Sequence, residues 1–229
     1  LSQKGYELIA VARDEEKLEQ LKSELKTNVK IIAIDISNVE NCKKIYEENK
    51  DIDILINNAG FGDCGYFAET NLEKDVQMIN TNVLATHVLT KLYLKEMTEK
   101  NSGKILNVAS IAGFMPGPLM ATYYSTKNYV VKLSEAIREE LKIKKSNVQI
   151  SILCPGPVNT NFNKVADVKF NLVEANSKQV ARYAVRKMFS NKILIFPSLT
   201  MWLGRMLFKI MPDQLSAFFC YFAQKRKII

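Results

Sequence analysis

The chain has 229 residues, 47% of them apolar, which is enough for one compact domain with a sizeable core. The formal net charge of +8 comes from Lys and Arg spread along the whole sequence, without a basic patch interleaved with aromatic residues, so we expect no nucleic-acid partner. Four cysteines without a C-x-x-C pair and a single histidine predict no metal site, and they indicate a reducing compartment, the cytoplasm.

Apolar runs typical of buried strands alternate with segments of helical period. The predicted strands are residues 6–12, 29–34, 52–56, 104–108, 148–153 and 193–196. The predicted helices are residues 15–25, 39–50, 72–100 and 177–189, together with one that begins near residue 121. Strands that are apolar throughout and separated by helices predict a parallel sheet covered on both faces, a doubly wound α/β fold of Rossmann type in a single domain.

Four residues stand at the carboxyl ends of predicted strands: Asp35, Asn58, Ser110 and Pro155. In open parallel sheets ligands bind just beyond these ends. We therefore expect the four side chains to meet in one cleft.

Tyr123 and Lys127 are four residues apart in a predicted helix, which places an ammonium on the same helix face as a phenol. A neighbouring cation favours phenolate and so lowers the pKa of a tyrosine, which suits it to general acid and base chemistry. The spacing alone is weak evidence, because it also occurs at Tyr46/Lys50, Tyr183/Lys187 and Tyr221/Lys225. A hydroxyl residue, Ser110, lies thirteen positions before Tyr123, whereas Ala33, Phe170 and Phe208 hold that position for the other pairs.

Taken together, these motifs resemble the short-chain dehydrogenase/reductase family. The pattern is NNAG after a strand at residues 57–60, Asn82 in the next helix, Ser110 before Tyr-x-x-x-Lys, and PG-x-V-x-T at residues 155–160. The resemblance extends to about Phe196. It implies an NAD(P)-binding domain in residues 1–196, and it leaves residues 197–229 as an apolar extension of the same domain.

The resemblance also implies roles for the catalytic candidates. Tyr123 is expected to protonate a substrate carbonyl, and Ser110 to bind the oxygen of that carbonyl. Lys127 is expected to lower the pKa of Tyr123 and to hold the ribose of a nicotinamide cofactor. Asn82 matches the helix asparagine of the family, which maintains a water-linked proton path to the lysine; Asn80 is a rival, but the register with Ala85 favours Asn82.

Further residues match cofactor-binding positions of the family. The matches are Asp35 and Ile36 beside the adenine, Asn58, Ala59 and Gly60 beneath it, and Pro155, Gly156, Val158 and Thr160 around the nicotinamide, with Tyr123 and Lys127 completing the set. A strand-end Asp or Asn can instead serve only as the cap of the next helix.

Charge at the end of the first visible strand predicts which cofactor is used. An acidic residue at such a strand end binds the ribose hydroxyls of NAD, whereas a basic residue suits the 2′-phosphate of NADP. Here Ala12 holds the acidic position and Arg13 follows it, so we expect NADP(H) rather than NAD(H). Asp14 is the contrary signal, and we interpret it as the cap of the following helix.

One family element is missing from the sequence. The first strand and the glycine-rich turn that binds the pyrophosphate should precede Leu1. We therefore expect the chain to be N-terminally truncated, which would affect both folding and cofactor binding. A literal G-x-G-x-x-G at Gly60, Gly62 and Gly65 follows the wrong strand, and we interpret it as coincidental.

Residues 198–227 are rich in aromatic and aliphatic side chains and end in basic residues. The segment is either a substrate lid or the face of a homo-oligomer, or it makes peripheral membrane contact. Either alternative suits a small apolar carbonyl or alcohol substrate. The sequence thus predicts an NADPH-dependent oxidoreductase that reduces an aldehyde or ketone reversibly; the alternatives are an NADP-binding sensor without turnover and an inactive truncated fragment.

Overall fold

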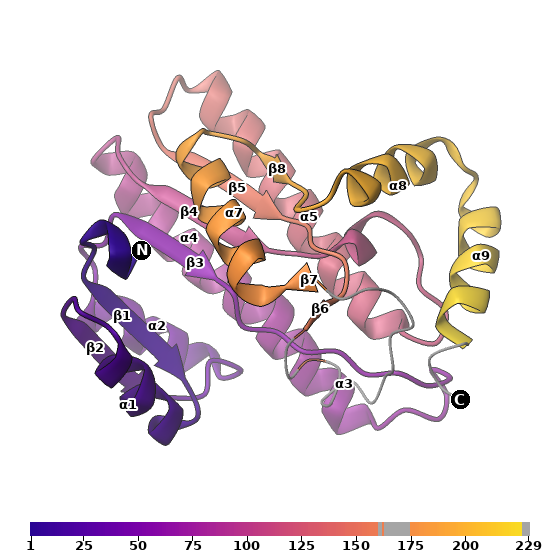
Figure 1. Ribbon diagram of the computed structural model, residues 1–229, viewed down its shortest axis with the longest axis horizontal. Coiled ribbons are helices and arrows are strands. Elements are labelled where there is room, and N and C mark those ends of the chain that lie inside the picture. Colours follow the sequence, from indigo (N-terminus) through magenta and orange to yellow (C-terminus); the bar gives the residue numbers. More distant parts are fainter. Residues whose placement is uncertain (160–161, 163–174, 226–229) are drawn as a thin grey trace.

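Parallel strands form the centre of the molecule, as the sequence predicts (Figure 1). The computed structural model describes residues 1–159, 162 and 175–225. Its main strands are β1 (Leu8–Ala12), β2 (Val29–Ala33), β3 (Ile54–Asn57), β4 (Lys104–Val108), β5 (Gln149–Leu153) and β8 (Leu194–Ile195). A further short parallel pair joins β6 (Val158–Asn159) to β7 (Ala175–Asn176).

Several helices begin at side-chain caps that the sequence encodes. Asp14 accepts a hydrogen bond from the backbone N–H of Lys17 at 3.1 Å, so it is the helix cap that we expected. Asn38, Asn71 and Asn176 cap later helices in the same way. The helices are α1 (Glu15–Glu24), α2 (Val39–Glu48), α3 (Leu72–Ile79), α4 (Thr86–Glu99), α5 (Ala121–Ile143), α7 (Ser177–Phe189), α8 (Leu199–Ile210) and α9 (Asp213–Lys225).

The predicted helix over 72–100 is interrupted by a π-helical turn, Asn80–Ala85, which separates α3 from α4. Asn82 lies in this turn, and both polar atoms of its amide bond to the loop that follows β3. A π-helical turn inserts an extra residue into the helix and often marks a functional site. The sequence period does not reveal it, because its cause is a contact across the fold.

The sheet is divided between β1 and β3. β1 pairs with β2, and β3 pairs with β4, but the described strands show no pairing between β1 and β3. Figure 1 shows β1 and β2 set apart from the four-stranded sheet. Residues of β1 and of β3 line the same large cavity, of about 2160 Å³. A parallel strand placed there would have a partner on each side.

Helices cover both faces of the four-stranded sheet (Figure 1). Ile105 and Ile150 pack into one core with α4 and α2. Leu106 and Leu153 point to the other face and pack against α7. Because successive strand residues point to opposite faces and both faces are covered, these strands are mostly apolar; the buried Asn107 and Ser151 are exceptions, and both are hydrogen-bonded.

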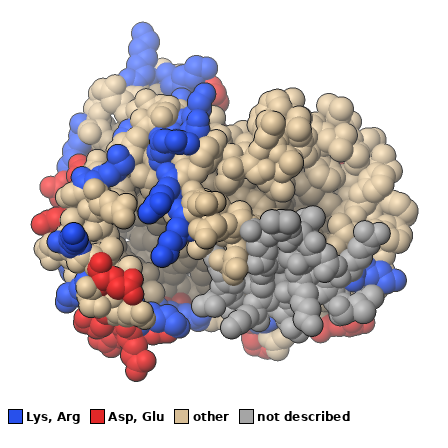
Figure 2. Space-filling model, in the orientation of Figure 1, with Lys and Arg blue, Asp and Glu red and all other residues tan. Residues whose placement is uncertain are grey.

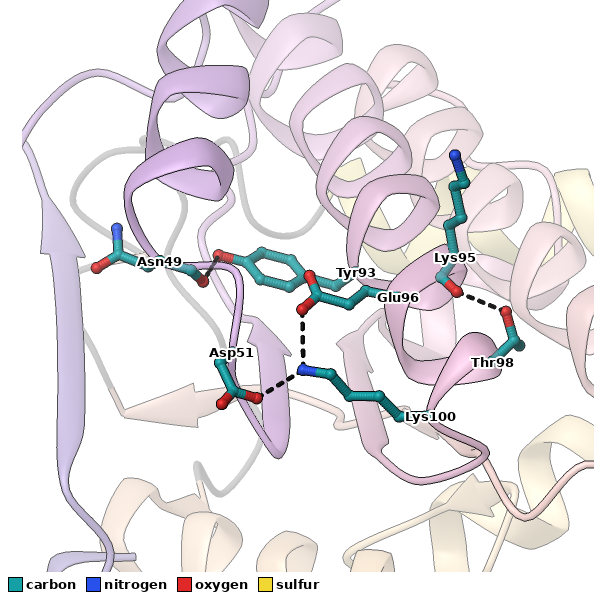
Figure 3. Close-up of polar contacts among 7 residues, drawn as sticks. All are labelled: Asn49, Asp51, Tyr93, Lys95, Glu96, Thr98 and Lys100. Atoms are coloured by element: carbon teal, nitrogen blue, oxygen red, sulfur yellow. Dashed lines mark hydrogen bonds and ion pairs between the residues drawn. The ribbon is translucent and has the colours of Figure 1, made fainter.

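A cluster of polar contacts joins α4 to the loop between α2 and β3, at the end of β3 opposite the predicted cleft (Figure 3). Lys100 Nζ donates to Asp51 Oδ1 at 2.6 Å and to Glu96 Oε1 at 2.9 Å, while Tyr93 Oη donates to the Asn49 carbonyl at 3.0 Å. Burial raises the pKa of Tyr93 to about 12, so this phenol stays a donor at all ordinary pH values.

Among the described helices, none is both long enough and apolar enough to cross a bilayer.

The divided sheet predicts uneven protection of backbone amides in β1. The Leu8 amide donates to the Asn28 carbonyl at 2.9 Å, so in this parallel pair the Ala10 amide also points to β2, while the Ile9 and Val11 amides point to the gap. We expect Ile9 and Val11 to exchange their amide hydrogens faster than Ala10 by roughly two orders of magnitude, measured by NMR. Equal protection of all three would mean that the gap is filled.

Candidate functional site

All four Tyr-x-x-x-Lys pairs place the lysine over the tyrosine ring. The Nζ atom lies 5.8 Å from the ring centroid in the Tyr123/Lys127 pair, and 5.4 to 5.9 Å in the other three. What distinguishes Lys127 is burial, since only 5% of it is exposed, whereas the other three lysines are partly or largely exposed. The pair on α5 is therefore a site of unusual electrostatics rather than a solvated helix face.

The Lys127 ammonium reaches under the end of β4. Its Nζ donates to the carbonyl of Val108 at 2.9 Å. Burial disfavours the charged amine and lowers the pKa of Lys127 to about 8. Lys127 is thus still protonated at neutral pH, but it can release a proton far more easily than a surface lysine.

Ser110 follows β4 directly and holds the start of the short 3-10 turn Ile111–Phe114. Its Oγ accepts from the Ala112 amide at 3.2 Å and donates to the Pro155 carbonyl at 3.4 Å. Two strand ends, those of β4 and β5, are therefore joined at this hydroxyl.

The pKa of Tyr123 moves in the direction opposite to the one we expected. Burial of the phenol raises its pKa to about 12, and a hydrogen bond with Ser110 offsets this only in part. Lys127 does not contribute to the shift in this structure, where its ammonium donates to the Val108 carbonyl, and burial of the phenol sets the direction. Tyr123 consequently holds its proton at neutral pH.

Asn82 lies behind the site rather than in the cavity. It is 1% exposed; its Oδ1 accepts from the Phe61 amide at 3.1 Å, and its Nδ2 donates to the Phe61 carbonyl at 2.9 Å and to Thr126 Oγ1 at 3.1 Å. Thr126 in turn donates to the Tyr123 carbonyl at 2.7 Å. One amide thereby ties the loop after β3 to the helix that holds Tyr123. The rival Asn80 is half-buried and ends α3.

Gly60 occupies a position where a larger residue would collide. A Cβ there would lie 2.9 Å from Asn82 Oδ1 and 3.2 Å from Lys127 Nζ. The loop backbone can therefore approach the two side chains closely only with glycine. The apparent G-x-G-x-x-G that begins here runs through irregular backbone and opens no helix before Leu72, which agrees with a coincidental match.

The other cofactor candidates lie along the same cavity. Those that line it are Arg13, Asp35, Ile36, Asn58, Ala59, Gly60, Tyr123, Lys127, Pro155, Gly156 and Val158. Thr160 lies outside the described residues. Arg13 is exposed, with Nη1 4.0 Å from Asp35 Oδ2. Asp35 also accepts from the Ser37 amide at 2.9 Å, so it shapes the turn before α2 while Asn38 caps that helix.

The residues fit a nicotinamide dinucleotide at both of its ends. A cation at Arg13 suits a phosphate, and the ammonium of Lys127 suits ribose hydroxyls. Gly60 lines the cavity in the same loop as Asn58 and Ala59. The described part of the chain supplies no glycine-rich turn that opens a helix beside β1, so the pyrophosphate has no such donors there.

Within residues 1–159, 162 and 175–225, no three His, Cys, Asp or Glu side chains gather to hold a metal.

Some residues of the site escaped the sequence analysis. The Phe162 ring lies 5.2 Å from the Tyr123 ring, centroid to centroid, and Met201 and Phe208 of α8 line the apolar end of the cavity. A Cβ on Gly156 would lie 2.6 Å from Met201 Sδ, so α8 rests on the loop after β5. Thr126, which links Asn82 to α5, was also missed; its position beside Lys127 was the only signal.

The family model for short chain dehydrogenases matches residues 1–169. The chain therefore belongs to the short-chain dehydrogenase family, a family of oxidoreductases, which confirms the resemblance seen in its motifs.

Individual relatives agree with this assignment. The very-long-chain 3-oxoacyl-CoA reductase of Homo sapiens is 33% identical over 179 residues, which are 72% of this chain and 55% of the human protein. The chain thus spans little more than half of that relative.

Solved structures share the fold. A short-chain dehydrogenase from Sphingobium yanoikuyae, in complex with NADPH, gives a TM-score of 0.79 at 23% identity, covering 93% of this chain and 89% of the other. A short chain dehydrogenase/reductase from Burkholderia phymatum, in complex with NAD, gives 0.81 at 21% identity, covering 90% and 85%.

The lowered pKa of Lys127 predicts a specific pH dependence of stability. The pKa of an unfolded lysine is about 10.4, so between pH 8 and that value the unfolded chain binds a proton that the folded chain lacks. The free energy of unfolding should therefore rise with pH in this window, and the full cost of burying the charge should be present below it. Relative to Lys127→Met, the free energy of unfolding of the unmodified chain should increase by about 2 kcal/mol from pH 7.5 to 9.5, measured by urea unfolding.

The control for this measurement is Lys225→Met, at the exposed lysine of an equally spaced pair. Its stability difference from the unmodified chain should not change with pH in this window. A Lys127→Met difference that is equally flat would mean that Lys127 titrates like a surface lysine.

Proposed function

We propose that the protein is an NADPH-dependent oxidoreductase that reduces an aldehyde or ketone to an alcohol, reversibly. The observation that carries the proposal is the convergence of Ser110, Tyr123 and Lys127 at one end of a cavity whose other end holds Arg13. Membership of an oxidoreductase family supports the reaction class.

When bound, the nicotinamide cofactor supplies the hydride for the carbonyl carbon. Ser110 Oγ orients the carbonyl oxygen, and the Tyr123 phenol donates its proton to that oxygen as the C–H bond forms. The raised pKa of Tyr123 keeps the phenol protonated at neutral pH, as a donor must be. Lys127 would hold ribose hydroxyls and, with its pKa of about 8, return a proton to the phenolate. Asn82 would sustain a water-linked path to Lys127; the reverse reaction uses the same groups.

The substrate that we propose is a small apolar carbonyl compound or its alcohol. The cavity beside Tyr123 is walled by aromatic and sulfur-containing side chains: Phe162, Met201, Phe208 and Phe219. A cavity of this lining favours an apolar chain or ring next to the reacting carbonyl. The human relative is named for a long-chain 3-oxoacyl substrate, which agrees with this class.

Replacing Tyr123 with phenylalanine tests the proton donor. We expect Tyr123→Phe to lose at least about a hundred-fold in NADPH-dependent turnover over a panel of aldehydes and ketones, because general acid catalysis contributes that much. Binding of NADPH, followed by fluorescence, should persist.

The matched control is Tyr183→Phe, which alters a tyrosine of the same Tyr-x-x-x-Lys spacing outside the cavity lining. Its turnover should equal that of the unmodified chain. NADPH binding without turnover in any variant would instead favour the sensor alternative.

The preference for NADPH is tested at Arg13. A charge-assisted contact to a phosphate contributes about 1.5–3 kcal/mol, so Arg13→Ser should raise the KM for NADPH by roughly ten-fold or more. The KM for NADH should change by less than about two-fold, because NADH lacks that phosphate. Initial rates with both cofactors measure the ratio, and an equal effect on both would contradict the assignment.

A further inference from the structure

The helices α8 and α9 each have an inner face that closes the apolar end of the cavity. Met201, Gly204 and Phe208 of α8 line it, as do Cys220 and Ala223 of α9. The inner face is held in place by buried polar contacts: Gln224 is 2% exposed and its Nε2 donates to the Tyr124 hydroxyl. The two helices therefore form part of the wall of the site.

The outer faces of the same helices are apolar and exposed. On α8 the residues Leu199, Leu203, Leu207 and Ile210 follow one another at spacings of three and four, so they share one helix face. Leu199 is 71% exposed and Ile210 is 81% exposed. On α9 the outward residues are Leu215, Phe218 and Phe222, all of them exposed.

Charge is distributed unequally around this surface. Figure 2 shows charged side chains gathered over the half of the molecule that holds β1, β2 and α7, whereas the part of the other half drawn in colour is mostly uncharged, with charged atoms only near its border. The two helices contain three basic residues, Arg205, Lys209 and Lys225, against one acidic residue, Asp213. Arg205 turns inward over the Phe114 ring, at 5.2 Å, so Lys209 and Lys225 border the apolar face.

We propose that the outer faces of α8 and α9 dock on the surface of an anionic lipid bilayer, and that an apolar carbonyl substrate passes from the lipid into the apolar end of the cavity that these helices line. Amphipathic helices with aromatic and aliphatic residues on one side and lysines at its border bind in the plane of such a surface. The docking is inferred from the surface residues of α8 and α9 alone, whereas the passage of substrate rests on the proposed function.

Charge favours a bilayer over a second copy of the chain. In a symmetric dimer through this face each patch meets its own copy, so the net positive charge of the two helices would face the same positive charge. An anionic lipid surface instead attracts Lys209 and Lys225. Tryptophan and phenylalanine, here Trp202 and Phe218, are also suited to the interface between lipid and water.

Co-sedimentation of the full chain with vesicles of phosphatidylcholine, with and without phosphatidylglycerol, tests the docking. Ile210→Glu should lower the partition coefficient roughly ten-fold or more, because a charge would replace an isoleucine that lies in the lipid when the chain is docked. Ile143→Glu is the matched control: Ile143 is also the last residue of its helix and is 79% exposed. It should change partitioning by less than about two-fold. Lys209→Gln should weaken binding about five-fold on anionic vesicles only.

Two results would overturn the docking. One is the absence of vesicle binding by the unmodified chain. The other is a lipid-free dimer, detected by light scattering, that Ile210→Glu dissociates and Ile143→Glu does not, since the face would then belong to a second copy.

Failure of the docking and failure of the proposed function are separable. Turnover of a water-soluble ketone without vesicle binding would contradict only the docking. Vesicle binding without any turnover would contradict only the proposed carbonyl reduction. If both hold, Ile210→Glu should slow reduction of a long-chain ketone presented in vesicles, roughly in step with its lost binding, and leave the soluble ketone unaffected. If Ile210→Glu reduced the long-chain ketone in vesicles as fast as the unmodified chain does, the passage of substrate from the lipid would be overturned.

Discussion

Backbone hydrogen bonding in a parallel sheet is the constraint on which this structure depends. Every interior strand must satisfy its N–H and C=O groups on two sides, and the site can form only where the carboxyl ends of paired strands are held level. Among the described strands, β4 and β5 pair on both sides and β3 and β8 on one, and together they align Asn58, Ser110 and Pro155 along one edge. β1 and β2 pair only with each other. The part of the cleft that includes Arg13 is therefore not joined to the four-stranded sheet by strand pairing in the described residues.

Local signals in the sequence predicted most of the elements. The apolar runs and the Asp14 and Asn caps are properties of short stretches, and they placed strand and helix boundaries within a few residues. The π-helical turn at Asn82 could not be predicted in this way, because it depends on a bond to Phe61, a loop residue twenty-one positions earlier. Periodicity carries no information about such a contact.

The same distinction applies to the site. All four Tyr-x-x-x-Lys pairs form the same local contact, so spacing could not separate them. The offset of Ser110 singled out one pair, and that pair is the one whose lysine is buried, because the offset reflects the arrangement of β4 and α5. The direction of the Tyr123 pKa shift was missed because it is set by burial, which a pattern of letters does not contain.

The close approach of Gly156 to Met201 joins two regions that have been described separately. Gly156 belongs to the loop after β5, next to Pro155, whose carbonyl accepts from Ser110, and Met201 belongs to the helix whose far side is exposed and apolar. With no Cβ between them, a displacement of α8 by as little as a bond length would press directly on the backbone of that loop. The wall of the cavity formed by α8 and the loop that bonds to Ser110 are therefore in direct contact, so a shift of the outer helix would be transmitted to this loop.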